Sequence, residues 1–167
     1  MHKPKPMEIA GYILGRVHEK DGCCTVYNAL DTEQGKSVLI RLYNHKLSAD
    51  PTFLDHFKSV TSRLIGKKLG HNIYIRDAFI ENACCAVVTN RTPHGAYRRE
   101  THPLFTQDEV VKIGIQLADS LNLLHAQGIL HGGVELSRLH FPAQGDVVLD
   151  MVALDRTMPK ARSVNKG

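Results

Sequence analysis

The second half of the chain holds two side chains that could act in proton transfer or metal binding: His131 and Asp150. A histidine can serve as a general base near neutral pH, and a carboxylate can hold a hard cation such as Mg²⁺. Gly132 and Gly133 follow the histidine directly and add no functional group. The chain has neither a G-x-S-x-G nucleophile elbow nor an H-E-x-x-H zinc motif, so it predicts no serine hydrolase and no zinc protease.

The four cysteines form two adjacent pairs, Cys23-Cys24 and Cys84-Cys85. Neither pair has the C-x-x-C spacing that is typical of zinc sites. If both pairs lie in β-strands, the two side chains of each pair point to opposite faces of the sheet. We therefore expect ordinary reduced thiols and no metal site, with a metal or redox role as the alternative.

Length and hydropathy favour a single globular domain with room for two small lobes, since the chain has 167 residues of which 43% are hydrophobic. No apolar run approaches the roughly 18 residues that a membrane-spanning helix needs. The N-terminus also lacks the apolar stretch of a signal peptide. We therefore expect a cytoplasmic protein with no membrane span in this chain.

The net charge of +4 comes from the two ends of the chain. Residues 156–167 contain four basic residues and no acidic one, and residues 1–6 contain two basic residues, so the body between them is slightly acidic. Basic ends can contact nucleic acid or anionic lipid, but solvated tails are the simpler interpretation. We expect no specific nucleic-acid partner.

The elements that must position these residues can be read from the periodicity of the apolar positions. Strands are predicted at residues 12–18, 23–30 and 37–43, joined by turns such as Asp21-Gly22. A helix is predicted from Pro51, because Asp50 can cap it and proline is favoured at the first helical position. The apolar residues of this helix share one face: Phe53, Phe57, Val60 and Leu64.

The second half of the chain is expected to be more helical. Strands at 73–80 and 84–89 come first, followed by a loop-like stretch at 91–105. The longest helix is predicted at about 106–127, where Thr106 and Glu109 form a capping box. Two short strands at 139–141 and 147–149 follow it.

Five stretches of the sequence resemble, in the same order, motifs of the protein kinases, in the style of the bacterial Ser/Thr kinases. Residues 31–41 resemble D-x-x-x-G-x-x-V-A-I-K, and the stretch from Leu123 to Gly133 resembles L-H-x-x-G-I-x-H-R-D. Residues 69–73 resemble L-x-H-P-N-I with one residue dropped. The remaining two are residues 25–29, which resemble the end of the glycine-rich loop, and residues 87–90, which resemble the start of the hinge.

The resemblance implies an α+β fold: a kinase-like N-lobe with a five-stranded antiparallel sheet and one helix, then a truncated, mainly helical C-lobe. It implies a flexible basic N-terminus at 1–9, the N-lobe at 10–90, the C-lobe at 91–155 and a basic tail or linker at 156–167. The activation segment and the peptide-binding helices of a full kinase are expected to be absent from this chain.

The positions of the glycine-rich loop carry other residues here. The three glycines of G-x-G-x-x-G align with Glu19, Asp21 and Cys24. Glycine lets the backbone N–H groups of such a loop approach the phosphates closely. Two carboxylates at these positions would instead repel ATP.

The lysine that contacts the α- and β-phosphates in kinases aligns with Arg41, which keeps the charge but is longer and forked. The glutamate that pairs with this lysine aligns with Val60, which cannot form an ion pair. A structural role for Arg41 is therefore the simpler interpretation.

The catalytic segment has lost its functional groups as well. The aspartate that accepts the substrate proton aligns with Gly133, and the metal-binding asparagine aligns with Arg138. The D-F-G motif aligns either with residues 151–153 or, shifted by one residue, with Asp150 as its aspartate. The resemblance assigns His131 a structural role, packed beside this motif.

Together these substitutions predict a catalytically inactive pseudokinase domain, without cofactor or metal, that acts as a protein–protein interaction or regulatory module. One alternative is a nucleotide-binding sensor or a weak atypical phosphotransferase that uses Arg41 and Asp150. Another is an α+β interaction domain unrelated to kinases.

The long helix at 106–127 leads to an expectation about partners. C-lobe helices surround this helix in a full kinase, and without them part of its apolar surface would be exposed. Large exposed apolar patches usually mark contacts. We therefore expect a homodimer or a dedicated protein partner on this face.

Overall fold

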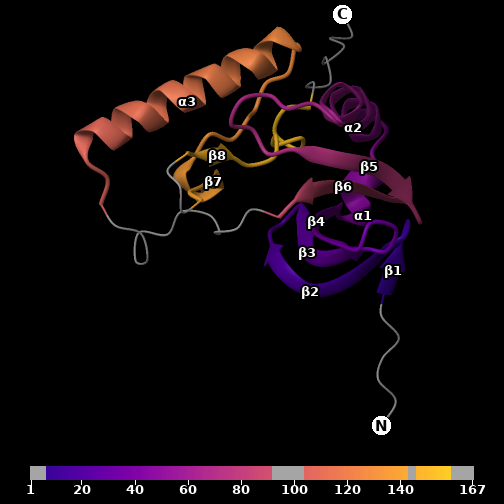
Figure 1. Cartoon of the computed structure of the whole chain (residues 1–167). Helices are drawn as coiled ribbons and strands as arrows, with labels where there is room; N and C mark the ends of the chain where they lie inside the picture. The colour runs from indigo at the N-terminus through magenta and orange to yellow at the C-terminus, as the bar shows by residue number, and fades with distance from the viewer. Residues whose placement is uncertain (1–6, 92–103, 143–145, 159–167) are drawn as a thin grey trace, which may run out of the picture.

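The fold is built on a strongly curved antiparallel sheet, seen in the computed structural model of the chain, which describes residues 7–91, 104–142 and 146–158 (Figure 1). The sheet has six strands in the order β1-β2-β3-β4-β6-β5. Their bounds are Met7–Ile9 (β1), Tyr12–Lys20 (β2), Cys24–Asp31 (β3), Lys36–Tyr43 (β4), Ile75–Glu81 (β5) and Cys84–Asn90 (β6). The α+β class is as expected from the sequence.

The expected count of five strands is wrong by one, because β1 adds a strand at the sheet edge. Met7 pairs with Leu14 and Ile9 pairs with Tyr12, within a segment for which the sequence predicted a flexible terminus at 1–9. A tight turn at Ala10 and Gly11, both with positive φ, reverses the chain. The side chain of Ile9 is buried against the sheet, which offsets the loss of chain entropy in this short strand.

Two helices follow β4: the single turn α1 (His45–Ser48) and the longer α2 (Pro51–Leu64). The Asp50 carboxylate caps α2 by accepting hydrogen bonds from the backbone N–H groups of Thr52 and Phe53. The apolar face of α2 packs against the sheet, where the rings of Phe53 and Phe57 contact the ring of Tyr43. This helix thereby builds the main core under β3 and β4.

The second half contains α3 (Gln107–Ala126), the 3-10 turn η1 (Leu136–Arg138) and the hairpin of β7 (Leu139–His140) and β8 (Val148–Leu149). The predicted capping box of Thr106 and Glu109 is present at the start of α3. Figure 1 shows the hairpin lying between α3 and the sheet. The apolar residues Ile113, Leu117 and Leu121 of α3 pack onto this hairpin.

The end of α3 and the segment after β8 complete the core that α2 begins. Leu124, Ile129, Met151 and Leu154 are buried in the same cluster as Phe53. Because this cluster joins both halves of the chain, it fixes the position of the segment 150–154 under the sheet. Within the described ranges, no helix has the length and apolar character needed to cross a membrane.

Candidate functional site

The central contact of the candidate site joins Arg41 on β4 to Asp150, which directly follows β8. The Nη2 atom of Arg41 donates a hydrogen bond of 2.9 Å to a carboxylate oxygen of Asp150, and each side chain is 13% exposed. The other terminal nitrogen of Arg41 lies 3.6 Å from the Sγ atom of Cys24. The sheet and the C-terminal segment therefore meet at a buried ion pair between residues 109 positions apart.

The two charges of this pair stabilise each other against burial. Burial acts to raise the pKa of Asp150, but the Arg41 guanidinium and the N–H of Met151, with smaller contributions from nearby cations, together hold the pKa below its ordinary value. Burial acts to lower the pKa of Arg41, but the Asp150 carboxylate, with smaller contributions from Tyr43 and Cys24, raises the pKa above its ordinary value. The guanidinium is thus already neutralised, and its charge is not free for a phosphate.

Val60 lies on α2 and is buried in the core, so it offers no charge to Arg41. In an active kinase a carboxylate from this helix would hold the cation. Here the carboxylate that pairs with Arg41 is that of Asp150. The structure brings Asp150 rather than residue 151 to Arg41, which favours the shifted alignment of the D-F-G motif.

His131 is buried beneath Asp150. Its Nε2 atom lies 2.9 Å from the backbone oxygen of Asp150, and its Nδ1 atom accepts a hydrogen bond of 3.3 Å from the N–H of Gly133. Because a carbonyl oxygen can only accept, these two contacts assign the neutral tautomer with the proton on Nε2. Burial also lowers the pKa of His131, which keeps the ring neutral. Both ring nitrogens of His131 are thus engaged by the backbone.

Arg138 occupies the space in front of Gly133. A Cβ atom placed on Gly133 would lie 3.2 Å from the Nε atom and 3.3 Å from the Cδ atom of Arg138. The guanidinium donates to the backbone oxygen of Met151 at 3.3 Å and to the carboxylate of Glu135 at 3.3 Å. The space beside Gly133 is therefore filled by a cationic side chain.

The three positions of the glycine-rich loop lie along the β2–β3 hairpin. Glu19 pairs with Val26 directly after a register shift in β2, and Cys24 is the first residue of β3. Asp21 forms the turn, where its Oδ1 atom accepts hydrogen bonds of 2.8 Å from the N–H groups of both Cys23 and Cys24. Burial raises the pKa of Asp21, but the hydrogen bond from the Cys23 thiol and the two N–H bonds together lower the value to about 2.

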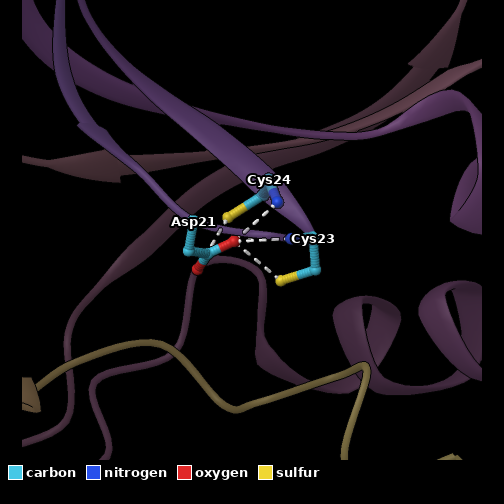
Figure 2. Close-up of side chains that lie close together, drawn as sticks. All are labelled: Asp21, Cys23 and Cys24. Atoms are coloured by element: carbon cyan, nitrogen blue, oxygen red, sulfur yellow. Dashed lines mark hydrogen bonds between the residues drawn. The ribbon is translucent and has the colours of Figure 1, made fainter.

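The expectation that Cys23 and Cys24 point to opposite faces is wrong. Cys23 lies in the turn and only Cys24 lies in the strand, so the alternation of side chains along a strand does not apply to this pair. Figure 2 shows both sulfur atoms beside the carboxylate of Asp21. Sequence patterns could not reveal this, because the strand was expected to begin one residue earlier.

The space between these elements is small. The cavity above the ion pair has a volume of about 20 Å³. It is lined by His18, Glu19, Val26, Leu39, Arg41, Ile73, Thr89, His140 and Asp150. One water molecule needs roughly 10–15 Å³, whereas small-molecule sites measure about 300–1,000 Å³. The sequence had not indicated His18, Thr89 or His140, and no motif marks them.

Comparison with known proteins gives a likeness in structure alone. No family model matches the sequence, and no curated protein matches it significantly. The kinase domain of PknI from Mycobacterium tuberculosis is similar: a point mutant superposes with a TM-score of 0.80 at 16% identity, over 92% of this chain and 64% of that one. The domain without substitutions gives 0.77 at 16% identity, over 91% and 63%. The fold is thus kinase-like, and the chain spans less than two thirds of those domains.

Proposed function

We propose that this chain is a catalytically inactive pseudokinase domain that acts as a protein–protein interaction or regulatory module. The observation that carries this proposal is the contact between Arg138 and Gly133. Phosphoryl transfer in kinases requires a carboxylate at the position of Gly133 and Mg²⁺ near the position of Arg138. A glycine covered by a guanidinium supplies neither.

The cavity above the Arg41–Asp150 pair supports the same proposal, because it is small and offers little to bind a nucleotide. Arg41, the cation at the phosphate-binding position, is neutralised by Asp150 at 2.9 Å. The cavity of about 20 Å³ above this pair would have to open widely before an adenine or a triphosphate could enter. Glu19 lines the same cavity and would add a negative charge next to any phosphate.

The exposed side of α3 supports an interaction role. Val110, Val111 and Ile115 are between 55% and 60% exposed, although the opposite side of the helix packs on the β7–β8 hairpin. Asp108, Lys112 and Ile115 border an open groove on this side. An apolar helix face of this kind fits a protein partner or a second copy of the chain.

Two measurements on the full chain test the proposal. Incubation with radiolabelled ATP, Mg²⁺ or Mn²⁺ and generic protein acceptors should give no transfer above background, with an active kinase domain assayed in parallel. Thermal denaturation at millimolar ATP should show no rise in melting temperature, because only a ligand that binds the native state raises it.

Metal-dependent labelling that disappears in the Asp150→Ala variant would contradict the proposal. Stabilisation by ATP without any transfer would instead favour the alternative of a nucleotide sensor that uses Arg41 and Asp150. The Arg41→Met variant separates specific from nonspecific stabilisation, because it removes the only arginine or lysine among the described residues that line the cavity.

A further inference from the structure

The turn between β2 and β3 gathers one carboxylate and two thiols that no catalytic role in the kinase fold requires. Asp21, Cys23 and Cys24 each offer one ligand atom, and these atoms all lie within 4.8 Å of one another (Figure 2). We propose that these three residues bind a borderline-soft divalent cation, of which Zn²⁺ is the type. The inference does not depend on whether the domain is catalytically active.

The spacing of the ligand atoms agrees with a single ion at their centre. The Sγ atom of Cys23 lies 3.0 Å from Oδ1 of Asp21, and the Sγ atom of Cys24 lies 3.6 Å from Oδ2. A tetrahedral ion with Zn–S bonds of about 2.3 Å and a Zn–O bond of about 2.0 Å separates sulfur from oxygen by about 3.5 Å. The Cys24 distance is close to this separation, and the Cys23 distance is about 0.5 Å shorter.

The backbone holds this arrangement before any ion arrives. The N–H groups of Cys23 and Cys24 both donate to Oδ1 of Asp21 at 2.8 Å, so the carboxylate is fixed and Oδ2 is turned toward Cys24. The N–H of Asp21 donates in turn to the backbone oxygen of Cys24 at 3.0 Å, which closes the turn. A preformed set of ligands lowers the entropy cost of binding.

The charges and the access route also fit a cation. Binding breaks the S–H bond of each cysteine and forms two S–metal bonds, and both protons pass to the solvent. The two thiolates and the carboxylate carry three negative charges against the two positive charges of the ion, so the occupied site has a net charge of −1. The Arg41 guanidinium lies 3.6 Å from the Cys24 sulfur. Asp21 is exposed and Cys23 is partly exposed, so an ion can enter from solvent and keep water as a fourth ligand.

The donor set selects the class of ion. Two sulfur ligands and one oxygen ligand favour Zn²⁺ and its chemical relatives Co²⁺ and Cd²⁺ over Mg²⁺ and Ca²⁺, which prefer oxygen alone. This distinguishes the site from the Mg²⁺ sites of kinases, which use a carboxylate and an amide.

The second cysteine pair of the chain provides an internal control. Cys84 and Cys85 are adjacent as well, but both lie inside β6, where Cys85 is fully buried and Cys84 is only partly covered. Strand alternation separates their side chains. Among the described residues, the only cluster with suitable ligand spacing is the one at the β2–β3 turn.

The test is a titration of the reduced, metal-free chain with Cd²⁺, in which binding is monitored by the ultraviolet absorption of thiolate-to-metal charge transfer. The affinity for Zn²⁺ is measured separately, by competition with a chromophoric chelator. We expect one ion per chain. Cys23→Ser and Cys24→Ser should each weaken binding by roughly 100-fold or more, and Asp21→Asn by about 10-fold, whereas Cys84→Ser should leave it unchanged.

A second readout locates the ion directly. One equivalent of Zn²⁺ should protect Cys23 and Cys24, but not Cys84, from alkylation, as mapped by mass spectrometry. The proposal is overturned if no charge-transfer band forms, if the band survives in Cys23→Ser, or if Cys84→Ser removes it. Cys24 is buried and its variant could misfold, so Cys23→Ser, at a partly exposed position, is the decisive substitution.

Discussion

Arg41 and Asp150 form an ion pair of 2.9 Å in which each side chain is only 13% exposed, and this pair links the central strand β4 to the segment that follows β8. In an active kinase the equivalent cation would be shared between a helix carboxylate and the nucleotide phosphates. Here α2 has Val60 at that position, and Arg41 pairs with Asp150 instead. The Arg41 guanidinium is therefore engaged within the protein by Asp150.

Breaking this pair should therefore destabilise the protein strongly. Asp150→Ala leaves a buried guanidinium without its partner, and we expect the free energy of unfolding to fall by about 3–5 kcal/mol. Replacing both residues, with Arg41→Met and Asp150→Leu, should recover most of that loss, because no uncompensated charge remains. Urea denaturation measured by circular dichroism gives both values.

The exposed ion pair between Lys112 and Asp146 is the matched control, since its side chains are 54% and 58% exposed. Lys112→Gln should cost less than about 1 kcal/mol. If Asp150→Ala cost as little as this control, the buried pair would have no structural role.

Stability should also fall with acid in a manner that depends on His131. Burial lowers the pKa of this histidine from its ordinary 6.5, so the unfolded chain binds a proton before the folded chain does. The contribution of His131 is complete above pH 6.5 and decreases as the pH falls from there toward the lowered folded value. The unfolding free energy, measured from about pH 7.5 to about pH 5, should show this slope.

His131→Gln should flatten that slope below about pH 6.5, whatever its effect on the absolute stability. His56 also has a pKa lowered by burial, and then by Arg63, so part of the slope should remain in the variant. An unchanged slope in His131→Gln would show that this ring is not the neutral, buried group described above.

Restoring the missing base should not restore activity. The carboxylate of a Gly133→Asp variant would stand beside Arg138, whose Nε atom lies 3.2 Å from the point that the new Cβ atom would occupy, and the two would pair. The double variant with Arg138→Asn removes this cation but leaves Val60 and the Arg41–Asp150 pair in place. We expect no Mg²⁺-dependent phosphoryl transfer from either variant, and transfer from the double variant would show that the cleft opens.

The exposed face of α3 gives a prediction about association. Ile115 is 60% exposed, so Ile115→Lys should change the free energy of unfolding by no more than about 0.5 kcal/mol. If this face holds a partner or a second copy, the same substitution should abolish the complex. Sedimentation velocity over a range of concentrations, with and without candidate partners, measures this.

Asp55→Asn, at an exposed position on α2 rather than α3, is the control, because it changes the net charge by the same amount outside this face. An association that Ile115→Lys leaves intact, or a chain that stays monomeric at high concentration and retains no partner, would exclude the face from such a role.

The order of strands and helices followed from the sequence because periodic apolar positions and caps are local signals. Thr106 and Glu109 predicted the start of α3, and Asp50 with Pro51 predicted the start of α2. The strand β1 was missed, since it has only three residues and no alternation of its own. Its pairing with β2 depends on the turn at Ala10 and Gly11.

Aligned motifs identified the positions of the candidate site but not how those side chains meet. They located Arg41, Gly133, Arg138 and Asp150, yet left open whether Asp150 belongs to the D-F-G position. They gave no sign that the Arg138 side chain covers Gly133, because a contact between side chains leaves no trace in a single sequence.

The sequence by itself determined the order of the kinase-like elements and which residue types stand at the aligned positions, because both depend on residue identity and local periodicity. Only the tertiary structure decided what fills the empty positions. The pairing of Arg41 with Asp150 joins residues 109 positions apart, and the grouping of Asp21 with two thiols depends on the strand beginning at Cys24. The ion pair results from the packing of distant segments. The grouping of Asp21 with the two thiols results from the backbone geometry of a local turn.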